Sequence, residues 1–278
     1  MRKLRSNAKD PTPIPKNFDP LTASARDLLK LGIPQRPDPQ TQPGLAALWE
    51  QRVQRYRGFE HLRTPVQQPV ENLPGSQAFG LEPTEACGYT LSSGAPFTAL
   101  FLTWTVPNLR FVASPQGTNL FRTFVGLGFL DVHVEMTVDP AQNVTATVTA
   151  VGVSSVGLPV QPGDVLTASM CLDTKPPGRA NYVLVNETRS QTVRFSFDTG
   201  FPPAVTINAG VSRGALNNPF NPLAQFGMVW FDEISAYTTD GFRSLTSGQA
   251  VTMVGRDGST LARPVRVGDF TFRVEHGG

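Results

Sequence analysis

The sequence predicts an all-β fold, an antiparallel β-sandwich preceded by a short, partly helical N-terminal arm. From about residue 75 onward, apolar and polar residues alternate with the period of a strand, and turn signals separate the alternating runs. The 278 residues include 25 Gly and 25 Pro but only 17% charged residues, which is typical of strands and turns. No long helical pattern interrupts these runs, so the sequence favours a sandwich.

The first 70 residues differ in composition from the rest of the chain. They carry 12 Lys+Arg and 6 Asp+Glu, hence a net charge of +6, whereas residues 71–278 carry 12 and 16, hence −4. Pro11, Pro13, Pro15 and Pro20 favour an extended start. We therefore divide the chain into a basic, Pro-rich arm, residues 1–70, and a β-sandwich domain, residues 71–278.

Two short helices are predicted within the arm. The first is Ala23–Leu31, with Thr22 or Ser24 as the N-cap and Gly32 at its end. The second is Leu45–Arg57, whose apolar stripe must be buried against another surface. We expect this helix to dock on the body of its own chain, and a partner protein or a second copy of the chain is the alternative. The stripe consists of Leu45, Leu48, Trp49, Val53 and Tyr56, while Arg52, Arg55 and Arg57 lie largely off it.

The β-sandwich domain is predicted to contain about ten strands. In one of them, Thr145, Thr147 and Thr149 alternate with Val and Ala residues, the pattern of a half-buried strand. Turn signals such as Gln161-Pro-Gly-Asp164 and Asp257-Gly258 lie between the strands. The predicted strands are Phe97–Val106, Arg122–Phe129, Val132–Val138, Val144–Val153, Val165–Cys171, Tyr182–Val185, Thr192–Phe197, Gly227–Tyr237, Ala250–Val254 and Phe270–Val274.

The order of particular segments along the domain carries a more specific signal. Over about residues 72–275 they resemble, in collinear order, segments of the glutamic peptidases, also called eqolisins or A4/G1 peptidases. The arm, with Asn17–Ser24 and Pro34–Pro39, resembles the leader of bacterial members. The matching segments are Phe97-Thr-Ala-Leu-Phe-Leu-Thr-Trp-Thr-Val-Pro107, Phe124-Val-Gly-Leu-Gly128, Leu130-Asp-Val-His-Val-Glu-Met-Thr-Val138, Val160-Gln-Pro-Gly-Asp-Val-Leu166, Tyr182-Val-Leu-Val-Asn-Glu-Thr-Arg-Ser-Gln-Thr-Val193 and Pro222-Leu-Ala-Gln-Phe-Gly-Met-Val-Trp-Phe231.

The resemblance implies a fold and a chemistry. The fold is a concanavalin- or jelly-roll-like sandwich of two bent, seven-stranded antiparallel sheets with a concave cleft. In the family, a Glu acts as general base on a water molecule, while a Gln amide orients the water and stabilises the oxyanion. A match to the family therefore implies peptidase activity only if this Glu and this Gln are present.

Neither residue is present in the matching segments. Asp131 stands at the Gln position, and an ionised carboxylate cannot donate a hydrogen bond to an oxyanion. Gly210 and Gly214 stand at the two Glu positions of the other segment, and no Glu occurs between Glu187 and Glu233. The sequence thus predicts a family scaffold without the family's catalytic pair.

Three polar residues on one predicted strand are the candidates for a replacement site. Asp131, His133 and Glu135 project from one face of the strand, and the residues between them are apolar. Same-face neighbours are about 7 Å apart, close enough for an Asp131–His133 or His133–Glu135 hydrogen bond or a shared metal. This face is a candidate for binding a cation or for acid–base chemistry, while a solvated sheet face is the favoured alternative. The metal question stays open, and no cofactor is predicted.

Three classes of function fit these observations. The favoured one is a catalytically degenerate binding or structural module, with a peptide or polysaccharide ligand in the cleft. An active acid endopeptidase, hence a hydrolase, that uses Asp131 and Glu135 is the second. A self-assembling protein that forms a homo-oligomer through residues 1–70 is the third. Nucleic acid is disfavoured as a partner, because the basic cluster of Arg2, Lys3, Arg5 and Lys9 is typical of a solvated tail.

Cellular location and cysteine pairing are weakly constrained. No apolar h-region follows the N-terminus, which predicts a cytoplasmic protein or export by a non-classical route. No run approaches the roughly 18 apolar residues of a membrane span. Cys87 and Cys171 form no metal-binding pattern, and a single disulfide between them is left open.

Overall fold

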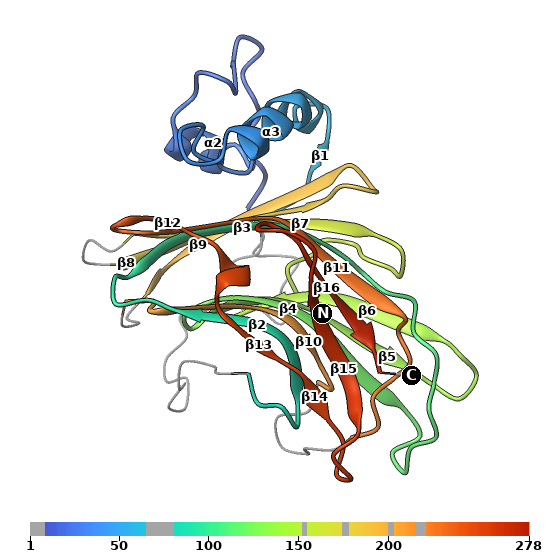
Figure 1. The fold of residues 1–278 in the computed structure, drawn as a ribbon. Helices are drawn as coiled ribbons and strands as arrows, with labels where there is room; N and C mark the ends of the chain where they lie inside the picture. The colour runs from blue at the N-terminus through green and yellow to red at the C-terminus, as the bar shows by residue number, and fades with distance from the viewer. Residues whose placement is uncertain are drawn as a thin grey trace.

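The computed structural model describes residues 9–64, 81–151, 155–173, 178–199, 203–214 and 221–277. Two sheets form a sandwich, as predicted, with the helical part of the arm lying outside it (Figure 1). One sheet has ten strands in the order β1-β9-β8-β7-β3-β11-β16-β15-β14, with β12 paired to β11, and the other has six in the order β13-β2-β10-β4-β5-β6. These numbers replace the seven-plus-seven arrangement that the family resemblance implies.

The described elements run in chain order from α2 in the arm to β16 in the ten-stranded sheet. All strand pairs are antiparallel except β1, which pairs in parallel with β9. The elements are α2 Ala25–Lys30, α3 Pro43–Tyr56, β1 Glu60–His61, β2 Ala86–Ser92, β3 Phe97–Thr105, β4 Asn119–Leu127, β5 Leu130–Val138, β6 Val144–Ala150, β7 Val165–Asp173, β8 Gly178–Asn186, β9 Gln191–Thr199, β10 Thr206–Ser212, β11 Met228–Thr238, β12 Gly241–Arg243, η1 Leu245–Ser247, β13 Gln249–Val251, β14 Met253–Val254, β15 Thr260–Arg266 and β16 Phe272–His276.

Five of these strands are absent from the prediction. Two of them, β1 and β12, are only two and three residues long, and the others are β2, β10 and β15. The predicted strand Ala250–Val254 divides into β13 and β14, which belong to different sheets. β2 and β10 are buried along most of their length, so they lack the alternation that marks a half-buried strand. β15 contains Pro264, which argues against a strand away from sheet edges.

The core lies between the two sheets and is built from alternating strand residues. In β5, Val132, Val134 and Met136 are fully buried in the core, and the residues between them point outward. Trp104 of β3 reaches across the core, where its indole N–H donates to the Thr123 hydroxyl of β4 at 3.0 Å. The predicted face assignment of β5 is therefore confirmed.

The arm packs on the outer face of the ten-stranded sheet (Figure 1). Its cluster of Leu28, Leu31, Ile33, Trp49, Val53 and Tyr56 contacts Val183 and Val185 of β8. The predicted docking of α3 on its own chain is confirmed, but the stripe is shifted. Ala46 is buried, whereas Leu45 is only partly buried and Leu48 is 38% exposed. Arg52, predicted to lie off the stripe, has a side chain only 15% exposed.

Two glycines allow β2 and β10 of the six-stranded sheet to approach closely. Gly88 and Gly210 are paired across the two strands. A Cβ atom at Gly210 would lie 2.0 Å from the Cys87 carbonyl oxygen, and one at Gly88 would lie 2.1 Å from the Ala209 carbonyl oxygen. Any side chain at either position would therefore force the strands apart.

We predict that Gly210→Ala destabilises the protein by about 1–3 kcal/mol, because the added methyl group overpacks the contact with β2. Gly94→Ala is the matched control, since a Cβ at Gly94 meets no atom within 4 Å, and we expect less than about 0.5 kcal/mol there. Urea denaturation of the full chain measures both values. Equal stabilities for the two variants would contradict the close approach.

Candidate functional site

The predicted polar face of β5 lies on the outer surface of the six-stranded sheet. His133 is hydrogen-bonded on both sides: Nδ1 lies 2.9 Å from Asp131 Oδ2, and Nε2 lies 2.5 Å from the hydroxyl of Thr149 on β6. The predicted Asp131–His133 contact is therefore present. The result is a relay of carboxylate, imidazole and hydroxyl. In such a relay the Asp131 carboxylate orients the imidazole of His133, which can act as a base on the Thr149 hydroxyl.

Glu135, the third predicted residue, has a different partner. Its Oε2 accepts from Arg122 Nε at 3.0 Å and from Arg122 Nη2 at 2.6 Å. The side chains of Asp131 and Glu135 are 35% and 38% exposed, so solvent reaches both carboxylates. Because each carboxylate is held by a separate cationic or imidazole partner, the pair does not form a shared-proton dyad.

A metal centre is not supported at this face. Among the described residues, no group of three or more His, Cys, Asp or Glu side chains is arranged to hold a metal ion. Both cysteines are free, with Cys87 on β2 and Cys171 on β7 in the other sheet, so the disulfide left open by the sequence is not formed. Burial raises the pKa of each thiol to about 12, which makes both poor nucleophiles.

The positions that the sequence resemblance matches to the family's catalytic pair lie on nearby strands. Asp131 on β5 pairs with Gly126 on β4, and Gly210 on β10 pairs with Phe124 of the same strand β4. The scaffold thus brings the two positions to one face of one sheet. Asn208, which is 4% exposed, covers Gly126, where a Cβ would lie 2.4 Å from the Asn208 Oδ1 atom.

A family comparison accounts for this arrangement of strands. The model of the peptidase A4 family matches residues 84–275, which is most of the chain and nearly all of the sandwich. The chain belongs to the peptidase A4 family.

Solved structures support the same conclusion at the level of the fold. Scytalido-glutamic peptidase with a peptide-based transition state analog is similar at a TM-score of 0.55 and 18% identity, over 69% of this chain and 98% of that chain. SCP-B, an eqolisin solved with the tripeptide Ala-Ile-His, is similar at a TM-score of 0.52 and 16% identity, over the same shares. At these identities the likeness shows the fold alone. No curated protein matches the chain.

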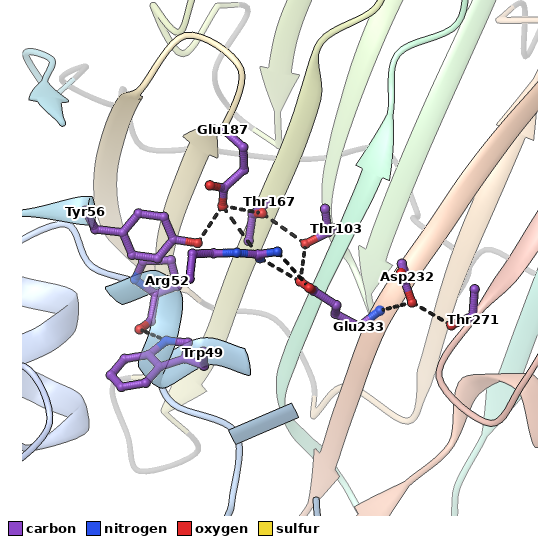
Figure 2. Close-up of polar contacts among 10 residues, drawn as sticks. Trp49, Arg52, Tyr56, Thr103, Thr167, Glu187, Asp232, Glu233 and Thr271 are labelled. Carbon is purple, nitrogen blue, oxygen red and sulfur yellow. Dashed lines mark hydrogen bonds and ion pairs between the residues drawn. The ribbon is translucent and has the colours of Figure 1, made fainter. Parts of the chain in front are cut away.

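This peptidase A4 chain has a second polar cluster, between the arm and the ten-stranded sheet, which we call the clamp (Figure 2). Arg52 of α3 makes two hydrogen bonds to Glu233 of β11, at 2.6 and 2.7 Å. Thr103 also donates to Glu233, at 2.8 Å, and lies 3.0 Å from the Thr167 hydroxyl. Thr167 in turn donates to Glu187 at 2.9 Å. The clamp thus joins two carboxylates through two hydroxyls and one guanidinium.

Glu187 completes the clamp on the side of α3. The Tyr56 hydroxyl donates to its Oε1 at 2.5 Å, and Arg52 Nη1 lies 3.7 Å from the same oxygen. Burial, with the Glu187 charge adding to it, raises the pKa of Tyr56 well above its ordinary value, so the phenol keeps its proton and donates. The other oxygen of Glu187 is buried and has no hydrogen-bond partner in the described parts of the chain.

The backbone at Glu233 is unusual. Its φ angle is +56°, in the left-handed region, and it lies where the register between β11 and β3 shifts. Its N–H donates to Asp232 Oδ1 at 2.8 Å, and the Thr271 hydroxyl holds the same oxygen at 2.5 Å (Figure 2). Such a conformation in a non-Gly residue costs of order 1–3 kcal/mol and persists where surrounding contacts hold it. Here the bulge turns the carboxylate toward Arg52.

Sequence reasoning missed the clamp for a definable reason. Arg52 and Glu233 are 181 residues apart, and no sequence pattern pairs them. Arg52 was predicted to lie off the apolar stripe of α3. Its position carried a signal nonetheless: it lies three residues after Trp49 and four before Tyr56, on the edge of the apolar stripe.

We predict that Arg52→Met destabilises the docked arm by about 3–5 kcal/mol, because it leaves two buried carboxylates without their cation. Arg55→Met is the matched control on the same helix, where the side chain is exposed, and we expect a change below about 0.5 kcal/mol. Hydrogen exchange of the α3 amides in the full chain measures the stability of the docked arm. Equal stabilities for the two variants would show that the clamp does not hold the arm.

Proposed function

We propose that this chain is a peptidase A4 family protein that has lost the glutamic-peptidase chemistry and serves as a binding module. The observation that carries the proposal is the contact at Gly210, the position aligned with the catalytic Glu. A Cβ there would lie 2.0 Å from a backbone oxygen of β2, so the position has no room for any side chain. The aligned Gly214 is similar: its φ angle is +77°, and a Cβ would lie 2.4 Å from Leu120 Cγ.

The second catalytic position supports the same proposal. Asp131 stands where the family has its Gln, and its carboxylate is engaged by His133. An ionised carboxylate accepts hydrogen bonds only, so it does not reproduce an amide that must donate to an oxyanion. Both halves of the family mechanism are therefore without their functional groups.

The binding surface we propose is the outer face of β4, β5 and β6. It combines the Arg122–Glu135 ion pair with the Asp131–His133–Thr149 relay, all at least partly exposed. Such a row offers both donors and acceptors to an extended polar chain. An extended peptide is the ligand we favour, since SCP-B of the same fold is solved with a tripeptide. A polysaccharide is the alternative ligand, and assembly through residues 1–70 stays a separate prediction.

The runner-up function is an active hydrolase, and one observation favours it. The Asp131–His133–Thr149 relay places an oriented imidazole 2.5 Å from a hydroxyl, as an activated nucleophile requires. An active acid endopeptidase built on Asp131 and Glu135 is less supported, because each carboxylate is held by its own partner.

We predict no cleavage when the full chain is incubated with denatured protein substrates from about pH 2 to pH 7, because general base and oxyanion donor are both missing. Mass spectrometry of the products measures cleavage, with Asp131→Asn and Glu135→Gln as paired variants. Cleavage that these variants abolish would contradict the proposal. Cleavage that survives Glu135→Gln but is lost in His133→Gln and Thr149→Val would establish the hydrolase built on the relay. If the protein does not cleave the peptides, measuring whether it binds them tests the binding function.

A further inference from the structure

One end of the six-stranded sheet is an open edge. The strand at this end is β6, which has seven residues and pairs with β5 on one side. The strands at the other ends of the two sheets, β13, β1 and β14, have only three, two and two residues. Short edge strands limit pairing with other chains. Of the described sheet ends, β6 is therefore the one that can pair with a further strand over several residues.

The pairing of β6 with β5 determines which of its backbone groups point toward the open side. The Val151 N–H donates to the Asp131 carbonyl oxygen, and the Asp139 N–H donates to the Asn143 carbonyl oxygen. Both pairs continue the β5–β6 register, in which hydrogen-bonded and non-hydrogen-bonded pairs alternate. The odd-numbered residues of β6 therefore bond to β5. The backbone groups of the even-numbered residues point away from β5, and these residues are Val144, Ala146, Val148 and Ala150.

The chain itself covers one part of this edge. The Val156 N–H donates to the Val148 carbonyl oxygen at 3.1 Å. Among the residues that the structure describes, no backbone group bonds to the outward N–H or C=O of Val144 or Ala146. The open part of the edge is thus residues 144–147, where donors and acceptors follow one another at the spacing of a strand.

The inward side chains show that the core is incompletely covered at the same place. Val144 and Ala146 pack against the core, yet both remain partly exposed. Their partners on β5, Val138 and Met136, are fully buried. One more strand beside β6 would cover the two exposed side chains with its own inward residues. Apolar residues at alternate positions of that strand would therefore be favourable.

The open edge also lacks the features that block strand pairing. Thr145 and Thr147 point outward and are exposed, and β6 contains no charged residue and no Pro. Its register with β5 runs without a bulge from Val144 to Ala150. Charged side chains, Pro and bulges are the usual protection of sheet edges. An incoming strand meets none of them here.

We propose that an extended peptide binds at residues 144–147 as an added strand of the six-stranded sheet, with apolar side chains at alternate positions facing the core. The inference rests on the proposed binding function and specifies its binding mode, because β6 is one of the three strands of the proposed surface. Main-chain hydrogen bonds provide the affinity, and the alternating side chains provide the selectivity.

A second copy of the chain is a less suitable occupant of the edge. Residue 156 of the chain already covers the edge at Val148, so two β6 strands could pair only over their open parts. So short a ladder is much smaller than the roughly 800 Å² per partner that a stable interface buries. A peptide needs no such area to bind reversibly.

Hydrogen exchange of the full chain, followed amide by amide by NMR, tests the proposal. The probe is a capped peptide, Lys-Thr-Val-Thr-Val-Thr-Val-Thr-Lys, whose valines share one face of a strand. In the free protein, the amides of Val144 and Ala146 should exchange faster than those of Thr145 and Thr147, which bond to β5. Peptide at ten times its dissociation constant should slow exchange at Val144 and Ala146 by about tenfold. A control peptide of the same residues with its three valines adjacent should bind more weakly.

Ala146→Pro is the critical variant, because it removes an outward N–H and leaves the hydrogen bonds to β5 in place. It should abolish the slowing that the peptide causes at Val144. Thr147→Ala is the matched control on the same strand, and it should bind the peptide as the wild type does. Ala146→Lys provides a second variant if the proline variant does not fold, because an inward charge at an edge opposes pairing.

Several results would overturn the proposal, and they separate it from the proposed binding function. Binding that persists in Ala146→Pro or Ala146→Lys and is lost in His133→Gln would place the peptide on the face of the sheet, so the binding function would stand and the edge would not. Slowing at Val144 that rises with protein concentration alone would assign the edge to a second copy. Absence of slowing in the wild type would exclude the edge, while binding of peptides from denatured proteins would still test the binding function.

Discussion

The six-stranded sheet depends on one contact, the close approach of β2 and β10 at Gly88 and Gly210. β10 pairs with β2 on one side and with β4 on the other, so this contact fixes the position of β4 and, through it, of β5. The same constraint excludes a side chain from the position aligned with the catalytic Glu of the peptidase A4 family. Backbone geometry thus accounts for the proposed loss of the Glu, while the Gln is replaced by the side chain of Asp131.

The two outer faces of the sandwich differ in what covers them. The outer face of β5 presents Asp131, His133 and Glu135, which remain partly exposed. The outer face of the ten-stranded sheet is covered by the arm. In the buried clamp, Arg52 of the basic arm pairs with carboxylates of the acidic sandwich domain. A buried ion pair gains little net stability over apolar packing, but a broken one is costly. The clamp therefore specifies where α3 lies, while the apolar cluster around Trp49 and Val53 provides most of the free energy that holds the arm on the sheet.

Much of this arrangement could be predicted from the sequence, and the failures share physical causes. The face assignment of β5 followed from strict alternation, and the docking of α3 followed from an apolar stripe. β2 and β10 were not predicted because strands buried along most of their length lack alternation. The clamp was not predicted because a charged residue such as Arg52 is expected to face solvent. Only the tertiary structure shows the bulge at Glu233 that turns a carboxylate toward that guanidinium.

The central claim is that the backbone of this chain cannot hold the family's catalytic Glu. The most direct test is to restore both family residues in one protein, Gly210→Glu together with Asp131→Gln, and to measure its cleavage of denatured protein at acid pH alongside its circular dichroism. Our account predicts no cleavage and a loss of folded protein, because the Glu side chain would clash with the Cys87 carbonyl of β2. A folded double variant that cleaves its substrate would contradict the account.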